Sequence, residues 1–240
     1  MSKNDCRGFT LIELLVVIAI IGILAAMLLG VLASAVNSAK SAKAKTEMSS
    51  LITAIQGYDE AYGRYPVSPA VLNLASTGNS DFTYGGSLLA AYAAQIGSGN
   101  YTTNNSEVIA ILMDITNYAG GGWTVNTNHS RNPQQTIYLN AHMSGDTNSP
   151  GVGTDLVYRD PWGNPYVITM DLNYNEVCED AFYKLPTVSA GGANGLILQP
   201  DGNYAYRGKV MVWSAGHNRT IDPGDPANDH ENHDNVLSWK

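Results

Sequence analysis

Hydrophobic and polar positions divide the chain into an apolar stretch near its beginning and a long polar remainder. Between Phe9 and Val36 the only charged side chain is Glu13, and the run from Leu14 to Val36 contains 23 residues without a charge. As a helix with a rise of 1.5 Å per residue, this run is about 35 Å long, which is enough to cross a lipid bilayer. The pattern therefore predicts a membrane-spanning helix.

After the apolar run the pattern becomes amphipathic, which predicts that the same helix continues. Apolar side chains recur at spacings of three and four residues, and charged side chains fall mostly between them. The stripe expected to be buried consists of Met48, Leu51, Ile52, Ile55, Tyr58 and Tyr62. Gly63 and Pro66 end the pattern. The two stretches together predict one helix over Phe9–Tyr62, about 80 Å long.

The segment 64–154 is rich in Gly, Asn, Ser and Thr, which predicts mostly loops. Two helices are expected within it, near Leu88–Ile96 and near Glu107–Tyr118. Asn104 and Glu107 are expected to form a capping box at the start of the second helix. Insertions of this kind carry subunit-specific recognition in some proteins and are variable surface loops in others.

Strand patterns begin at Asp155 and continue towards the C-terminus. The elements that they predict are a turn at Asp160–Asn164, a strand at Tyr166–Leu172, a turn at Asn173–Asn175, and two strands that pair around Gly208, Tyr204–Tyr206 and Val210–Trp213. The expected fold class is therefore α+β. It consists of a long N-terminal helix packed on a small antiparallel sheet, with additional helices and loops.

The formal net charge of −8 argues against nucleic acid as a partner, because the phosphate backbone requires a basic surface. The five histidines lie outside any recognised nucleophile motif, and the Gly-rich segments lack the lysine and the spacing of a P-loop. We therefore expect no enzymatic activity.

The residues before the apolar run differ from an ordinary secretory signal. In such a signal the cleavage site follows the apolar stretch, whereas here a polar leader with Lys3 and Arg7 ends at Gly8 and the apolar run comes afterwards. A plain single-span anchor is the alternative on hydropathy alone. Glu13 argues against it, because a carboxylate inside a membrane span is costly unless it is paired and therefore marks a functional position.

Gly8 followed by FTLIELLVVIAIIGILAAM resembles the cleavage and methylation signature of type IV prepilins and type II secretion pseudopilins. The resemblance implies that a prepilin peptidase cleaves after Gly8 and that Phe9 becomes the methylated N-terminus. It also implies that Glu13 accepts the ammonium group of a neighbouring subunit's Phe9. Two opposite charges in an apolar bundle neutralise each other and fix the axial step between subunits.

The resemblance further implies partners and a location. The partners are copies of this chain in a helical homopolymer, other pseudopilins, the prepilin peptidase and an inner-membrane assembly platform. The chain would span the inner membrane once, with its polar remainder in the periplasm. Gly30 stands where many pilins have proline, although Gly22 is kept. Lys40, Lys43 and Lys45 follow the span and oppose this orientation by the positive-inside rule, but the cleavage signature takes precedence because the peptidase acts on a cytoplasmic leader.

Two further segments resemble major pseudopilins. AYGRYP at Ala61–Pro66 resembles the end of the long helix, and DPWGNPY at Asp160–Tyr166 resembles the start of the small antiparallel sheet. Arg64 and Tyr65 are expected to fix the exit of the chain from the helix. Trp162 is expected to cover the core.

The C-terminal segment SAGHNRTIDPGDPANDHENHDNVLSW holds five Asp and Glu residues between positions 222 and 234. Oxygen-rich turns suit calcium, which accepts irregular shells of six to eight ligands. The segment also resembles the C-terminal loop of major pseudopilins, and this resemblance implies a calcium site. The candidate ligands are Ser214, Asp222, Asp225, Asp229 and Asp234. The alternative is a solvated acidic tail.

Two other segments suggest metal sites. His230 and His233 lie among acidic residues and suggest zinc or copper, but two histidines in a flexible segment fix no geometry. The phrase Asp-x-Asn-x-Asn at residues 171–175 opens like an EF-type loop. Glu176 replaces its sixth-position glycine and Phe182 its twelfth-position acid, so a turn is expected instead.

Together these observations predict a structural subunit of a periplasmic pseudopilus that serves type II secretion-like export. The alternatives are a surface type IV pilin and a membrane-tethered binding module that uses the same targeting signal and holds its ligand in the segment 67–154. The expected organisation is a leader at 1–8, a transmembrane and polymerisation helix at 9–36, its amphipathic continuation at 37–63, a variable insertion at 64–154, and a β-sheet region with the acidic loop at 155–240.

Overall fold

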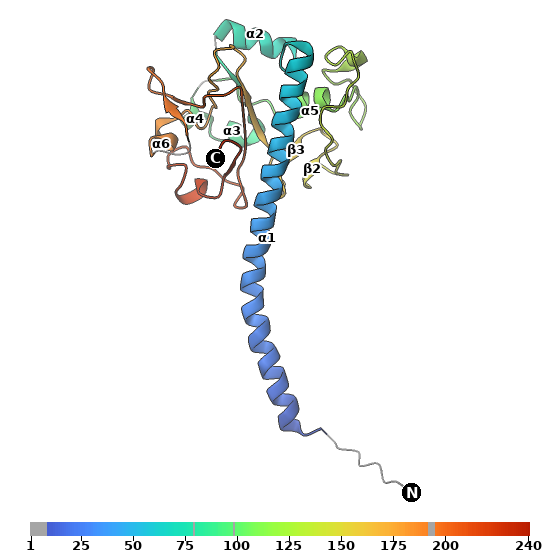
Figure 1. The fold of residues 1–240 in the computed structure, drawn as a ribbon, viewed down its shortest axis with the longest axis vertical. Coiled ribbons are helices and arrows are strands. Elements are labelled where there is room, and N and C mark those ends of the chain that lie inside the picture. Colours follow the sequence, from blue (N-terminus) through green and yellow to red (C-terminus); the bar gives the residue numbers. More distant parts are fainter. Residues whose placement is uncertain (1–8, 79, 98, 192–194) are drawn as a thin grey trace. The chain divides into compact units, whose positions relative to one another are not determined.

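The computed structural model describes residues 9–240 apart from residues 79, 98 and 192–194. The chain divides into two compact units, Met1–Lys40 and Ser41–Lys240, and we call the second unit the head. The helix α1 (Leu11–Tyr62) runs through both units (Figure 1). It ends where the sequence predicts. Gly63 adopts a left-handed φ of 63°, and its N–H donates to the carbonyl of Asp59 at 2.7 Å, which closes the last turn.

Within the head, α1 buries one stripe of apolar side chains. The fully buried members are Ala44, Met48, Leu51, Ile55 and Tyr58. Ile52 and Tyr62 are partly buried against the same core. The stripe predicted from the three- and four-residue spacing is therefore confirmed, and this part of α1 forms one wall of the core.

A four-stranded antiparallel sheet lies at the centre of the head. Its order is β1 (Phe82–Tyr84), β4 (Val167–Met170), β7 (Val210–Ser214) and β8 (Val236–Leu237). Ile168 lies opposite Val212 and Val167 opposite Trp213. The first pair belongs to the core that includes α1, whereas the second pair belongs to another buried cluster. Both faces of the sheet are thus covered, which explains why β4 and β7 are nearly continuous apolar runs.

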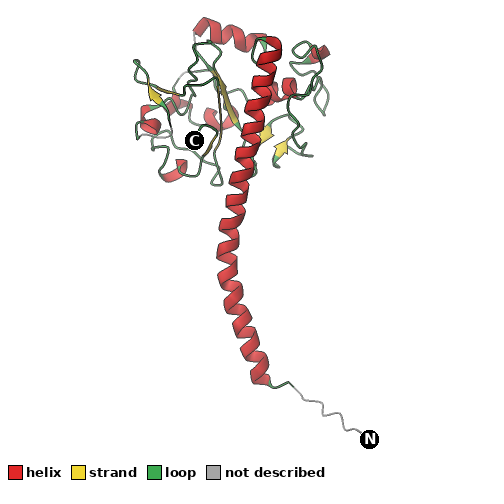
Figure 2. Ribbon diagram, in the orientation of Figure 1, coloured by secondary structure: helices red, strands yellow, loops and turns green. Residues whose placement is uncertain are grey.

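The other described elements of the head are short, and loops connect them over much of its length (Figure 2). The helices are α2 (Pro69–Gly78), α3 (Gly86–Ala90), α4 (Ala93–Ile96), α5 (Ser106–Leu112), η1 (Thr127–His129), α6 (Pro186–Ser189) and η2 (His230–Asn232). Two further antiparallel pairs of strands are present. β2 (Gly151–Val152) pairs with β3 (Tyr158–Arg159), and β5 (Ile197–Leu198) pairs with β6 (Tyr204–Ala205). The α+β fold class is therefore confirmed.

The pairing expected between Tyr204–Tyr206 and Val210–Trp213 is wrong. β6 pairs with β5, whereas β7 pairs with β4 and β8. A tight turn closed by a hydrogen bond from the N–H of Gly202 to the carbonyl of Gln199, at 3.0 Å, joins β5 to β6 locally. β7 instead takes the two long-range partners that complete the buried sheet.

The helices expected between residues 64 and 154 are shorter than predicted. α3 and α4 replace the single helix near Leu88–Ile96, and α5 ends at Leu112 rather than near Tyr118. The capping box of Asn104 and Glu107 is not formed. The carboxylate of Glu107 instead accepts the backbone N–H of Ser68 at 2.6 Å and the hydroxyl of Tyr84 at 3.0 Å. Contacts to distant segments therefore replace local capping.

Candidate assembly site

The first turn of α1 holds Glu13 in a defined geometry. The backbone N–H and the hydroxyl of Thr10 both donate to Glu13 Oε2, at 2.8 and 2.6 Å, and the N–H of Glu13 donates to Thr10 Oγ1 at 3.3 Å. This reciprocal arrangement is a capping box of the Thr-x-x-Glu type. It begins the helix at Leu11, two residues after the predicted start at Phe9.

The apolar side chains described in the unit Met1–Lys40 are exposed. Phe9 is 78% exposed and Met27 is 67% exposed. In the described part of the chain, α1 is the one helix long and apolar enough to cross a membrane. Such an apolar surface is stabilised by lipid or by neighbouring chains rather than by water. Gly8, the predicted cleavage position, lies outside the described residues.

Comparison with protein families identifies this region. The prokaryotic N-terminal methylation motif matches residues 3–35. The chain carries the prepilin-type signal of type IV pilins and pseudopilins. Comparison with curated proteins and with solved structures found no match.

The prepilin-type signal confirms the broader part of the predicted function. Proteins with this signal are processed by a prepilin peptidase and assembled into a pilus or pseudopilus. The signal and the exposed apolar helix together support membrane anchoring of the chain. Type IV pilins and pseudopilins, which carry this signal, are structural proteins rather than enzymes.

The DPWGN segment forms a turn around one buried carboxylate. Asp160 Oδ1 accepts the N–H groups of Trp162 and Asn164 at 2.8 and 2.9 Å. Asp160 Oδ2 accepts the side-chain amide of Asn164 at 2.8 Å and the hydroxyl of Ser214. Burial raises the pKa of Asp160, and the hydrogen bonds from Ser214 and Asn164 oppose this rise. Ser214, a candidate calcium ligand, therefore ties this turn to the end of β7.

Three other candidate calcium ligands in the C-terminal loop have local partners. Asp222 Oδ1 accepts the N–H of Gly224 at 2.7 Å, and Asp229 Oδ1 accepts the N–H of His230 at 2.8 Å. Asp225 Oδ2 lies 3.4 Å from Nδ1 of His230. Over the described residues, no three His, Cys, Asp or Glu side chains lie together where they could hold a metal ion.

Asn232, which the sequence analysis did not single out, organises this loop. It is fully buried, and its side-chain oxygen accepts the N–H of Asp222 at 2.9 Å. Its amide nitrogen donates to the carbonyl oxygens of Asp222 and Asp225 at 2.7 and 2.9 Å. An uncharged amide thus binds two backbone carbonyls of a kind that also bind calcium.

Asp234 differs from the other candidate calcium ligands in having one buried carboxylate oxygen without a partner among the described residues. Its Oδ2 accepts the N–H groups of His217 and Asn218 at 2.7 and 2.9 Å and lies 2.6 Å from Nδ1 of His217. Its Oδ1 is buried and has no hydrogen-bond partner among the described residues. A buried carboxylate oxygen without a donor suits a cation. Calcium binding stays a prediction, and Asp234 is its centre.

The two alternative metal hypotheses have different outcomes. His233 Nδ1 lies 2.6 Å from the carbonyl oxygen of His230, so that ring nitrogen is already used locally. Its other ring nitrogen stays available, but over the described residues no three His, Cys, Asp or Glu side chains lie together here, so the geometry gives a zinc or copper site no support. The carboxylate of Asp171 accepts the N–H groups of Asn175 and Glu176 at 3.1 and 2.8 Å. This confirms the turn expected there instead of an EF-type loop.

Proposed function

We propose that this chain is a structural subunit of a periplasmic pseudopilus in a type II secretion-like export system. Before assembly it is anchored in the inner membrane by one span, with its head in the periplasm. The observation that carries the proposal is a prepilin-type signal that continues into a helix with exposed apolar side chains. The segments AYGRYP and DPWGNPY, which resemble major pseudopilins, favour a pseudopilus over a surface pilus.

Assembly is proposed to pair Glu13 with the methylated ammonium group of Phe9 in a neighbouring subunit, after cleavage behind Gly8. The hydrogen bonds from Thr10 both use Oε2 of Glu13. The capping box therefore orients the carboxylate and leaves Oε1 to accept the ammonium group. Such pairing neutralises two charges in apolar surroundings, so one register between subunits is favoured over slipped ones.

A surface type IV pilin is the second candidate, because it uses the same N-terminal signal. Fractionation of cells that express the chain separates the two candidates. Recovery in periplasmic complexes that cross-link to other pseudopilins and to the inner-membrane assembly platform supports the pseudopilus. Recovery in fibres sheared from the cell surface supports the pilin. A chain that stays monomeric in the membrane and binds a ligand through residues 67–154 would contradict both.

We also infer that calcium stabilises the C-terminal loop through Asp234. The unpartnered Oδ1 of Asp234 supports this inference. The amide of Asn232, which already holds the carbonyls of Asp222 and Asp225, limits how many ligands the loop offers. Thermal melting with and without calcium tests this part of the proposal independently of assembly.

A further inference from the structure

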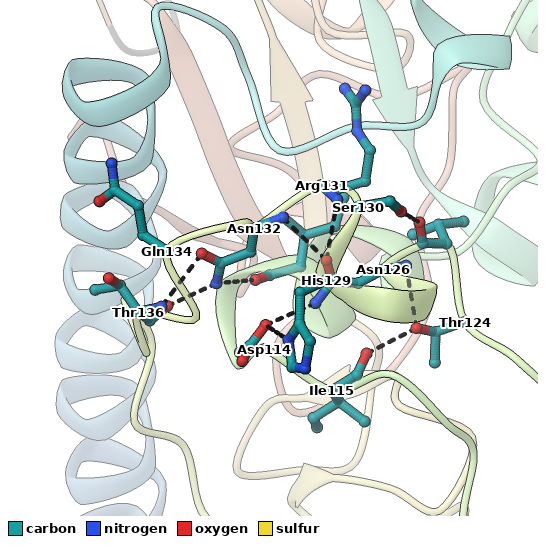
Figure 3. A network of polar contacts seen from close by, with 12 residues as sticks. Asp114, Ile115, Thr124, Asn126, His129, Ser130, Arg131, Asn132, Gln134 and Thr136 are labelled. Atoms are coloured by element: carbon teal, nitrogen blue, oxygen red, sulfur yellow. Dashed lines mark hydrogen bonds and ion pairs between the residues drawn. The ribbon is translucent and has the colours of Figure 1, made fainter.

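Arg131 lies in a segment of the head whose backbone is held firmly. Its N–H donates to Asn126 Oδ1 at 3.2 Å. Its carbonyl oxygen accepts the hydroxyl of Tyr58 at 2.5 Å and Nη2 of Arg64 at 3.2 Å. Asn126 and Asn132 belong to the polar network in Figure 3, which runs from Asp114 to Thr136. These hydrogen bonds hold the backbone of Arg131 in place.

The Arg131 side chain leaves this network, and two of its nitrogen atoms find no acceptor among the residues that the structure describes. Figure 3 shows that it extends away from the hydrogen-bonded side chains of the network. Arg131 is only 8% exposed, and its Nε and Nη2 are buried without a hydrogen-bond partner among the described residues. Nε of Arg64 is likewise buried and unpartnered. The two arginine side chains thus hold three buried nitrogen donors that have no acceptor in the described part of the chain. Nη2 of Arg64 donates to the carbonyl of Arg131, and the Arg64 guanidinium lies 5.8 Å from the centre of the Tyr62 ring.

Arg159 provides a comparison within the same head. It is also 8% exposed, but its Nη1 and Nη2 donate to the two carboxylate oxygens of Asp155 at 2.9 and 2.6 Å. Neither Arg131 nor Arg64 forms an ion pair with an acid in the described structure. Removing a charge from water is costly unless it is paired. Arg159 meets this requirement through Asp155, whereas Arg131 has no ion pair among the described residues.

The surroundings of Arg131 make its positive charge less favourable. Burial, and then the like charge of Arg64, lower the pKa of the Arg131 guanidinium. Glu107 is the acid that opposes this effect, but its Oε1 accepts hydrogen bonds from Ser68 and Tyr84. Arg64 is only partly buried and so keeps some contact with solvent, whereas Arg131 is buried.

We propose that Arg64 and Arg131 form a binding site for an oxyanion, the carboxylate or phosphate group of a ligand. The planar guanidinium fork matches such groups, and charge-assisted hydrogen bonds to them are strong. The oxyanion comes either from a small molecule in solution or from an acidic side chain of a second copy of this chain, whose net charge is −8. The second source rests on the proposed polymerisation, whereas the first does not.

The test uses the full chain in a non-ionic detergent, with inorganic phosphate as the probe and sodium chloride of equal ionic strength as the reference. Phosphate should raise the melting temperature of the unchanged protein. Arg131→Met should abolish this rise, and Arg131→Lys, which keeps the charge but not the fork, should weaken phosphate binding about tenfold or more. Arg207→Gln is the matched control, because Arg207 is an exposed arginine of the same head. It should respond like the unchanged protein.

Without phosphate, Arg131→Met should melt at a higher temperature than the unchanged protein, because a buried and unpaired charge has been removed. A lower melting temperature by the same amount with and without phosphate would show a purely structural arginine and overturn the proposal. An equal phosphate response in Arg131→Met and the unchanged protein would mean an adventitious ion only, and would also overturn it.

Light scattering on the same samples distinguishes the two sources of the oxyanion. If phosphate raises the melting temperature and also shifts oligomers towards monomers, it displaces a carboxylate of a second copy. If it raises the melting temperature and leaves the oligomer distribution unchanged, the site takes a free anion. The second result supports the anion site even if the proposed polymerisation fails.

Discussion

The two ends of α1 use apolar side chains in opposite ways. Ile21, near its start, is 58% exposed, whereas Leu51 and Ile55, within the head, are fully buried. The buried end completes a core that the chain builds for itself. The exposed end needs lipid or other chains, because exposed apolar side chains are unfavourable in water. The exposed end therefore serves assembly, and the buried end serves folding of the head. Substitutions at the exposed end should change filament formation, whereas substitutions at the buried end should change the free energy of unfolding.

The largest expected effect is the loss of polymerisation in Glu13→Ala. Removal of the carboxylate makes the apolar stretch easier to insert into a membrane, but the Phe9 ammonium group of the next subunit loses its partner. Membrane fractionation should find the variant in the membrane, and electron microscopy should find no filaments. Thr10→Ser, which keeps both side-chain roles in the capping box, is the control and should still polymerise. Normal filaments from Glu13→Ala would show that packing alone sets the register.

The next largest effect is expected when an apolar side chain is truncated to alanine at each end of α1. Leu51→Ala should lower the free energy of unfolding of the head by about 2–5 kcal/mol, because it leaves a cavity in a closed core. Ile21→Ala should leave it unchanged, because Ile21 is exposed. Thermal or urea unfolding of the full chain in detergent measures both. Equal losses of stability at the two positions would contradict the division between an assembly end and a folding end.

A third effect lies in the head alone and depends on pH. Burial raises the pKa of Asp81 to about 7, and the charges of Asp171 and Glu179 add to the rise. The folded head therefore keeps a proton on Asp81 that the unfolded chain releases near pH 4, so this carboxyl lowers stability as pH rises from about 4 to 7. Each unit of pKa shift corresponds to about 1.4 kcal/mol.

Asp81→Asn should remove this contribution. The variant should be more stable than the unchanged protein at pH 8, and the difference should shrink towards pH 4. Urea unfolding at pH 4, 6 and 8 measures it. A difference that is constant with pH would mean that Asp81 does not titrate in this window. Polymerisation of the variant should be unaffected, because Asp81 lies in the head.

The smallest expected effect concerns calcium at the C-terminal loop. A ligand that binds only the folded state at a hundredfold excess over its Kd adds about 2.7 kcal/mol. Calcium, but not equimolar magnesium, should raise the melting temperature, since magnesium demands a stricter octahedral shell. Asp234→Ala should abolish the response, whereas Asp201→Ala, at an exposed acid elsewhere in the head, should keep it. Identical melting curves with chelator and with calcium would contradict calcium binding. Asn232 would then be the group that holds the loop.

Local patterns in the sequence were sufficient to predict the structural features that depend on residues close together in the chain. The end of α1 follows from Gly63 and Pro66, and its buried stripe follows from helical spacing. The strand β4 and the turn at Asp160–Asn164 follow from apolar residues next to turn residues. These features depend on contacts close in sequence, so the sequence displays them directly.

Features that depend on distant partners could not be predicted in the same way. β1 is only three residues long, and its pairing with β4 joins residues more than eighty positions apart. Glu107 satisfies a local capping pattern but binds Ser68 instead. The capping box that does form, Thr10 with Glu13, has the Thr-x-x-Glu spacing, and that spacing could have identified it. The roles of Asn232 and Arg131 depend on buried neighbours that the sequence does not display.

The N-terminus of the protein made in bacteria that contain a prepilin peptidase tests most directly whether α1 is a pilin-type assembly helix. Intact-mass measurement and N-terminal sequencing should find a chain that begins at Phe9 and carries a methyl group on its amine. Gly8→Leu should leave the uncut precursor in the membrane. A mature chain that begins at Met1, or one cleaved after Ala33 or Ala35 as by an ordinary signal peptidase, would contradict the assignment of α1 as a pilin-type assembly helix.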